Sequence, residues 1–122
     1  FQQFGNRALA TEPMAGLAQV ALAQGEIAAA QAQVEAILPI LQEQPYASYN
    51  DPFFIYLTVY RVLAANGDER AAAFLQEGHD LLQQHAAALD EESRQRFLTA
   101  VPIHRDLAAA YVLLQAQREQ MI

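Results

Sequence analysis

Residues 22–30 read LAQGEIAAA, and residues 63–72 read LAANGDERAA. In both stretches an apolar segment stops at a glycine, Gly25 or Gly67, and an acidic residue then opens an alanine-rich segment. Glycine readily adopts the left-handed conformation that closes a helix, and an acidic residue is favoured at the positive N-terminal end of the next one. The pattern therefore predicts two helical hairpins, and tandem hairpins are typical of stacked helical arrays.

The composition supports an all-α fold. The chain has 122 residues, of which 25 are alanine and 15 are glutamine. Both residue types form helices well, and alanine also lets neighbouring helices approach closely. We expect a single all-α domain over residues 1–122, with about six helices arranged as a right-handed superhelical array of antiparallel pairs.

The expected helix pairs span residues 12–43, 51–89 and 90–118. Thr11 followed by Pro13 predicts the start of the first helix, because proline is tolerated in a first turn. Pro39 removes a hydrogen bond from the second helix and predicts a kink or an end near Leu38. Residues 53–63 are apolar almost all round, which places the third helix at the centre of the domain.

The remaining helices are predicted from similar signals. We expect the fourth helix to begin at Asp68. Asp90 predicts the start of a short fifth helix, which Pro102 ends or bends. The sixth helix is expected from about Ile103 to Arg118, with one apolar side facing the core.

The two hairpins resemble the tetratricopeptide repeat, in which a glycine closes the first helix and a small residue five positions later marks the helix crossing. Leu17, Gly25 and Ala30 fall on repeat positions in the first unit, and Gly67 and Ala72 fall on them in the second. Gly25 and Gly67 are 42 residues apart, whereas the repeat has 34 residues. Tyr60 also stands where the family prefers a small residue. The departures favour a tetratricopeptide-like array over a regular one.

A narrower resemblance covers residues 52–111. The segments PFFIYLTVYRVL at 52–63, GDERA at 67–71 and RQRFLTAVPIHR at 94–105 look like the C-terminal region of very large bacterial regulators. Those proteins join a nucleotide-binding ATPase switch module, as in some transcription activators and cyclases, to a long helical-repeat array. The resemblance implies a bacterial array that acts in signal transduction or transcription regulation. The absence of an initiator Met before Phe1 fits a fragment of such a longer chain.

Charge and composition argue against several functions. The net charge is −7, lysine is absent, and no arginine cluster compensates, so we expect no nucleic-acid partner. No apolar run approaches the roughly 20 residues that span a bilayer, and we expect no membrane partner. The chain has no cysteine, which excludes thiolate metal sites and favours the cytoplasm.

No residue pattern predicts catalysis, a cofactor or a metal. His79 and His85 are six residues apart and therefore lie on different faces of a helix. The tripeptide at residues 104–106, His-Arg-Asp, matches a kinase catalytic loop only in its letters. Tyr56 and Tyr60 lie one turn apart and are candidates to line a groove, although packing in or beside the core is the favoured interpretation.

We therefore expect a noncatalytic protein–protein interaction or scaffolding module. Its partner would be a protein or peptide that carries Arg or Lys, and another segment of the same polypeptide is the leading candidate. The alternative is a sensor domain whose groove binds a small effector. The first helix, with Met14, Leu17, Val20 and Leu22, is expected to present apolar surface and to support a homodimer of the isolated fragment.

Overall fold

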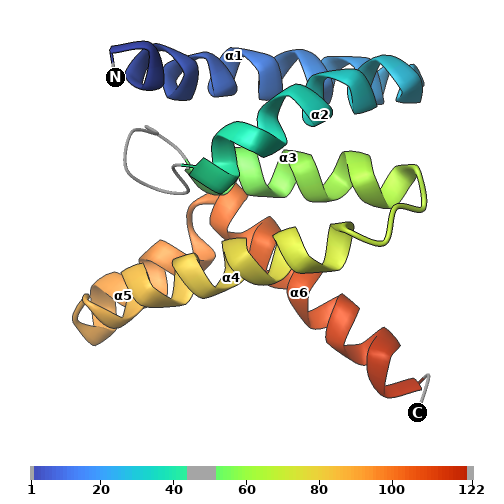
Figure 1. Cartoon of the computed structure of the whole chain (residues 1–122). Helices are drawn as coiled ribbons and strands as arrows, with labels where there is room; N and C mark the ends of the chain where they lie inside the picture. The colour runs from blue at the N-terminus through green and yellow to red at the C-terminus, as the bar shows by residue number, and fades with distance from the viewer. Residues whose placement is uncertain (1, 44–51, 121–122) are drawn as a thin grey trace.

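The computed structural model describes the backbone of residues 2–43 and 52–120, and the side chains of 13–41 and 52–119. These residues form six α-helices and no strand (Figure 1). The helices are α1 Gln2–Ala23, α2 Ile27–Glu43, α3 Pro52–Ala65, α4 Ala71–Ala87, α5 Glu91–Thr99 and α6 Pro102–Gln120. The all-α prediction and the predicted number of helices are confirmed for this part of the chain.

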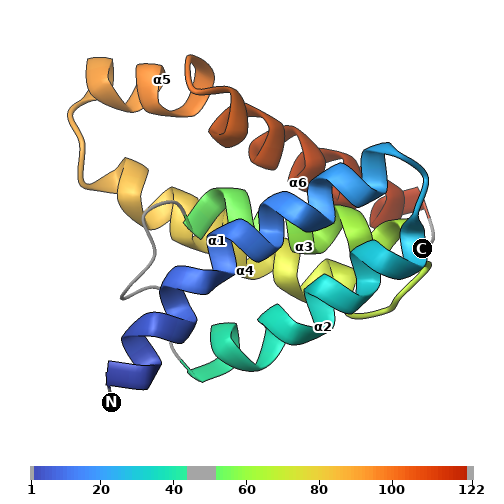
Figure 2. The same cartoon turned by 90° about the horizontal axis from the view of Figure 1, so that it is seen from above.

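Helices α1 to α4 pack as two consecutive pairs, and α5 does not extend this arrangement. α1 pairs with α2 and α3 pairs with α4, and α3 also contacts both helices of the first pair. α6, rather than α5, contacts both α3 and α4. α6 therefore has the same relation to the second pair as α3 has to the first, and the short α5 lies only against α4 and α6 (Figures 1 and 2).

α3 is the centre of the domain, as its all-round apolar sequence predicts. Its side chains are buried against helices on several sides, and the buried ones are Phe53, Ile55, Tyr56, Leu57, Thr58, Val59, Val62 and Leu63. A helix without a polar face is stable only where neighbours cover it. The same core cluster extends to Val34 and Ile37 of α2, Leu75 and Leu82 of α4, and Leu107 of α6.

Both hairpin turns are closed by a glycine in the left-handed region, with φ 78° at Gly25 and φ 67° at Gly67. The amide of Glu26 donates to the carbonyl of Ala21 at 2.8 Å, and the amide of Gly25 donates to Leu22 at 3.0 Å. The second turn repeats both bonds, from Asp68 to Leu63 at 2.9 Å and from Gly67 to Ala64 at 3.0 Å. These are two Schellman motifs, and they confirm the predicted helix ends.

The two turns differ in length after the glycine. α2 begins at Ile27, two residues after Gly25, whereas α4 begins at Ala71, four residues after Gly67. The predicted start of α4 at Asp68 is therefore wrong. The Asp68 carboxylate accepts a hydrogen bond from the amide of Arg70 at 2.9 Å, and such a local side-chain bond competes with helical pairing and prolongs the turn.

Neither internal proline ends its helix. α1 begins at Gln2 and continues through Pro13, so the predicted start beside Thr11 is wrong. α2 continues through Pro39 to Glu43 and does not end near Leu38. Ile40 and Leu41, which come directly after Pro39, are buried in the core, and this burial offsets the hydrogen bond that the proline removes.

The two C-terminal helices begin where their sequence signals predict, but the 81° bend between them is not the antiparallel pairing expected over residues 90–118. Asp90 precedes α5 with extended backbone, and its side chain accepts a hydrogen bond from the amide of Ser93 at 2.8 Å. α6 then begins at Pro102, where the missing N–H carries no penalty. In the described part of the chain no single helix is long and apolar enough to cross a bilayer; α5 and α6 meet that length only as a pair bent by 81°.

Candidate interaction surfaces

Of the five residues that the repeat pattern selects, only Ala30 lies at a helix crossing. Ala30 of α2 is fully buried, as are Ala15 and Ala18 of α1, so small side chains line the first crossing from both helices. In the second hairpin Ala71 is the buried residue, while Ala72 is only half-buried. The longer turn after Gly67 moves the start of α4, and the position five residues after the glycine no longer marks the crossing.

The close approach in the second pair occurs at Gly78. A Cβ atom placed on Gly78 would lie 2.8 Å from the Cβ of Tyr56 and 3.5 Å from a methyl carbon of Leu107. α3, α4 and α6 therefore meet at this glycine. The sequence pattern alone predicts no role for Gly78, although the glycine stands on the same helical line as Leu75 and Leu82.

The two groove candidates, Tyr56 and Tyr60, differ in burial. Tyr56 is 1% exposed and belongs to the core, so its groove role is wrong and the packing interpretation holds. Tyr60 is half-buried and packs against the edge of the core cluster. Tyr46 and Tyr49 lie outside the described residues.

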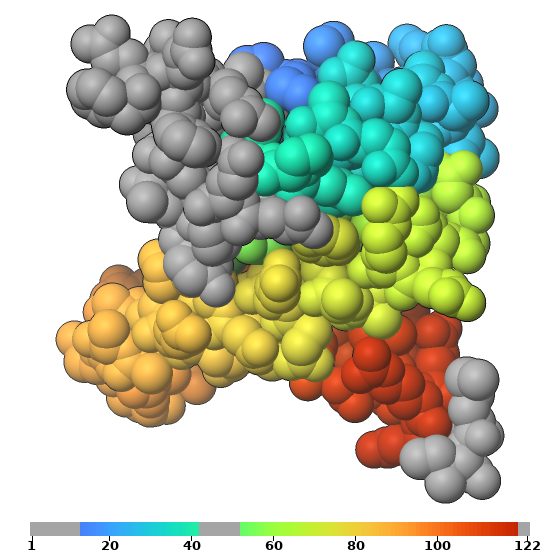
Figure 3. All heavy atoms as spheres, in the orientation of Figure 1, coloured from blue at the N-terminus to red at the C-terminus, as the bar shows by residue number. Residues whose placement is uncertain are grey.

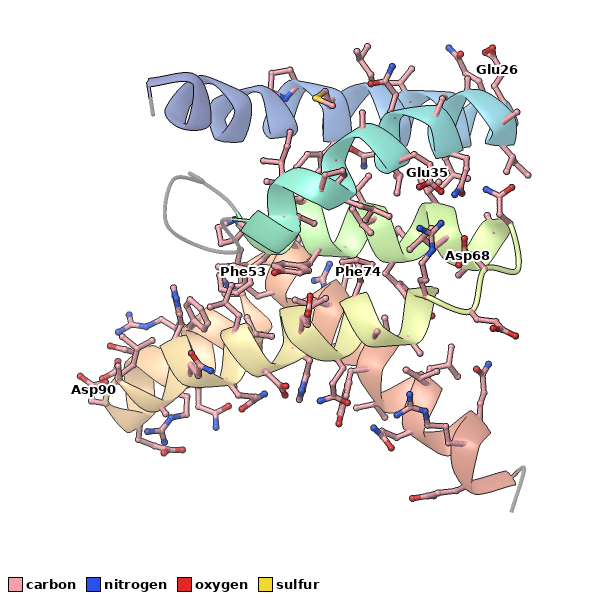
Figure 4. The ribbon with its side chains drawn as sticks, in the orientation of Figure 1. Glu26, Glu35, Phe53, Asp68, Phe74 and Asp90 are labelled. Atoms are coloured by element: carbon pink, nitrogen blue, oxygen red, sulfur yellow. The ribbon has the colours of Figure 1, made fainter. Side chains whose placement is uncertain are left out.

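A polar network joins α2 of the first pair to the turn of the second (Figure 4). The Arg70 guanidinium donates to Glu35 Oε2 at 2.6 Å and to Asp68 Oδ2 at 2.8 Å. Glu35 also accepts from Gln31 at 2.6 Å, and Gln31 accepts from Asn66 of the turn at 2.9 Å. Glu35 on α2 thus points toward the turn that carries Asp68, and the network fixes one pair against the next.

This network shifts the pKa values of its charged side chains. Hydrogen bonds from Arg70 lower the pKa of Asp68 to about 2, and bonds from Arg70 and Gln31 lower the pKa of Glu35. The two carboxylates in turn raise the pKa of Arg70. All of these groups lie at the solvent-exposed surface, where ion pairs contribute little to stability. The network therefore orients the helix pairs rather than serving as a buried reactive site.

A cluster of aromatic rings anchors α5 and α6 to the core. The ring of Phe53, at the start of α3, meets His104 at 4.8 Å and His85 at 5.3 Å, both edge to face. Phe97 of α5 lies 4.2 Å from the His104 ring, and His104 Nδ1 donates to the Phe97 carbonyl at 2.8 Å. Edge-to-face packing of this kind is favourable, and together with the hydrogen bond to Phe97 it accounts for the position of His104.

The other histidine on α4 stacks on an aromatic ring. The imidazole of His79 lies 3.6 Å from the ring of Tyr111 on α6, with 5° between the planes. Burial lowers the pKa of His79, which favours the neutral ring in this stack. No group of three potential metal ligands occurs among the residues that the structure describes.

Arg94 is held by backbone groups and is not open to a phosphate. Its guanidinium donates to the carbonyls of Ala86 at 3.1 Å and Leu89 at 3.0 Å, and to Glu91 at 2.8 Å. A cation that satisfies the last carbonyls of a helix acts as a cap. The charge of Arg94 is thus committed to the C-terminal end of α4.

The outer side of α1 exposes large apolar side chains. Leu17 is 58% exposed and Val20 is 54% exposed, and Ile27 at the start of α2 is 38% exposed. Leu17 is predicted to belong to the repeat packing, but it lies outside the core. No residue from 13 to 25 carries a charge. We call Leu17, Val20 and Ile27 the α1 surface.

Comparison of the chain with protein-family models, with curated proteins and with solved structures finds no match.

Proposed function

We propose that this domain is a noncatalytic interaction module, a tetratricopeptide-like right-handed array that binds a segment of a larger regulatory protein at the α1 surface. The observation that carries the proposal is the exposure of Leu17 and Val20 on an uncharged helix face. Contiguous exposed apolar side chains on a folded domain mark surfaces that bind protein. The contacts of α3 and α6, each with both helices of the preceding pair, support the repeating arrangement.

The partner that fits this surface is an amphipathic helix with apolar side chains on one face and Arg or Lys beside them. The apolar face would cover Leu17 and Val20, because helices bind helical surfaces through side chains spaced three and four residues apart. Basic residues at the flanks of the partner helix would complement the net charge of −7. They would also complement Glu26, which stands exposed at the end of the α1 surface (Figure 4). A segment tethered in the same polypeptide would need only modest affinity.

Fluorescence anisotropy with two labelled peptides tests the proposal. Both peptides carry the same Leu/Ala helix, with arginines flanking it in one and glutamates in the other. We expect the arginine peptide to bind more tightly, and to bind more weakly as salt is raised. Val20→Glu should weaken its binding at least about tenfold, because it places a charge in the apolar contact.

Val112→Glu is the matched control, since Val112 is also an exposed valine and lies on a different helix, α6. It should leave peptide binding unchanged. Equal binding of the two peptides would contradict the charge preference. Undiminished binding to the Val20→Glu protein would overturn the assignment of the α1 surface.

A further inference from the structure

The outward side of α6 carries a second line of exposed residues. Residues 105, 109, 112, 116 and 119 are spaced by alternating steps of four and three, which places them on one side of the helix. All five are exposed, and Val112 at the centre is 67% exposed, with Leu113 beside it at 58%. We call this line, with Leu113, the α6 seam. Its members are Arg105, Ala109, Val112, Leu113, Ala116 and Glu119.

The seam lies on the side of α6 that faces away from the core, and the C-terminal half of α6 also extends beyond α4 (Figure 1). Figures 1 and 3 show this half of the helix projecting from the body of the molecule. Leu107, on the opposite side of the helix, is fully buried in the core. α6 is thus apolar on two sides, and neighbouring helices cover only one of them.

The charges on α6 lie at the two ends of the seam. Arg105 stands at one end of the seam and Glu119 at the other, and no charged residue lies on the helix between Asp106 and Arg118. Asp106 and Arg118 are each one residue, or 100° of helical turn, away from a seam residue. Asp106 lies 3.5 Å from Arg61 of α3 and 3.7 Å from Arg105. Arg105 and Glu119 are about 21 Å apart along the helix at 1.5 Å per residue. A helix that covers the seam must therefore offer an apolar centre and opposite charges at its two ends.

We propose that a second copy of this chain covers the seam, with the two α6 helices antiparallel about a two-fold axis at Val112. In this arrangement Arg105 of each subunit faces Glu119 of the partner subunit. A parallel pair would instead place like charges together at both ends. Ala109 and Ala116 are small enough to let the two helices approach closely, and the antiparallel direction also opposes the two helix dipoles.

This inference is independent of the proposed peptide site, which lies on α1. A contact of about four helical turns is small compared with a standard interface, so the dimer is expected in the micromolar range. The net charge of −7 does not prevent dimerisation through α6, because the two arginines and the two acidic residues between positions 105 and 119 have a net charge of zero.

Cysteine cross-linking tests the geometry, because the natural chain has no cysteine. Under mild oxidation Val112→Cys should form a disulfide-linked dimer, since residue 112 lies at the axis, within the roughly 7 Å between Cα atoms that a disulfide permits. Arg105→Cys alone should not cross-link, because the two copies of residue 105 lie about 21 Å apart. A mixture of Arg105→Cys and Glu119→Cys chains should cross-link. Self-linking of Arg105→Cys would overturn the antiparallel arrangement.

Sedimentation equilibrium tests the interface itself. Val112→Glu should raise the dimer dissociation constant at least about tenfold, and Arg105→Glu should raise it severalfold. The double variant Arg105→Glu/Glu119→Arg should restore it to within about twofold, because it exchanges the charges at the two ends. Val20→Glu is the control and should leave the dimer intact. A strictly monomeric natural chain, or a dimer lost through Val20→Glu alone, would overturn the proposal.

Discussion

The two hairpins α1–α2 and α3–α4 use the same turn but bring their helices together differently. Each first helix ends in a Schellman motif at a glycine with positive φ. In the first hairpin the buried residues at the crossing are alanines, among them Ala18 and Ala30. In the second hairpin a glycine in the middle of α4, Gly78, lies against Tyr56.

The difference shows that a turn motif determines where a helix ends but not where the next helix crosses it. α2 begins two residues after Gly25, whereas α4 begins four residues after Gly67. Because an α-helix advances 100° per residue, a shift of two residues rotates every later side chain by more than half a turn. The small residue must then appear at another position, and in α4 it is Gly78.

The largest effect is expected at the first crossing. Ala30→Leu adds a branched side chain where the native residue has no exposed surface, and overpacking should lower the free energy of unfolding by about 3 kcal/mol. Ala72→Leu should cost less than about 1 kcal/mol, because Ala72 is half-buried at the start of α4. Urea denaturation of both variants measures the difference.

Ala88→Leu serves as a control, since Ala88 is exposed just beyond α4. The Ala88→Leu change should leave the free energy of unfolding almost unchanged. Equal losses from Ala30→Leu and Ala72→Leu would mean that the two hairpins cross in the same register, contrary to the structure.

The second-largest effect is expected when Gly78 and Gly16, two glycines that lie inside helices, are each replaced by alanine. Gly78→Ala places a Cβ 2.8 Å from the Cβ of Tyr56, an atom that cannot move away without shifting α3. We expect the variant to lose about 1–2 kcal/mol, even though alanine favours a helix over glycine by about 1 kcal/mol. Thermal and urea unfolding measure the change.

Gly16→Ala is the matched substitution in the first hairpin. Apart from the backbone of α1 itself and the two neighbouring residues, no described atom lies within 4 Å of a Cβ built on Gly16. Only the gain in helix propensity therefore remains, and the variant should be more stable by about 0.5–1 kcal/mol. The two Gly→Ala changes are thus expected to have opposite signs. A stabilised Gly78→Ala protein would show that α3 and α4 are not held this closely.

Local signals in the sequence predict much of this fold. Four of the confirmed predictions depend only on neighbouring residues. They are the left-handed conformations of Gly25 and Gly67, the helix cap at Asp90 and the burial of the all-apolar α3. Periodicity also predicts the helical class. These features are local because a cap or a turn is completed within five or six residues of the chain.

Features that depend on tertiary contacts could not be predicted in the same way. Pro13 and Pro39 locally disfavour a helix, but α1 and α2 continue through them. Tyr56 carries a hydroxyl that suggested a groove, yet it is buried where α4 crosses α3. The α6 seam was also missed, because the 3.6-residue period identifies an apolar face without telling whether the fold covers it.

The smallest effect concerns the longer turn of the second hairpin, whose Asp68 and Arg70 hold Glu35 of α2. Arg70 lowers the pKa of Asp68 from 3.8 to about 2 and also lowers the pKa of Glu35. A lowered carboxyl pKa stabilises the folded chain above the unfolded pKa, and this stability is lost as the pH falls from about 4 to about 2. Arg70→Gln should therefore reduce the drop in Tm between pH 5 and pH 2.5.

The change should be slight, because the groups are exposed, and it should shrink further in high salt. Asp90, whose pKa the Ser93 amide lowers, contributes equally in both proteins and cancels from the comparison. Arg96→Gln is the control, since Arg96 pairs with Glu92 within α5 alone. If Arg70→Gln kept the full pH dependence of the natural chain, the longer turn would not tie the second hairpin to the first, and the tie would have to come from the apolar contacts of α3 with α1 and α2.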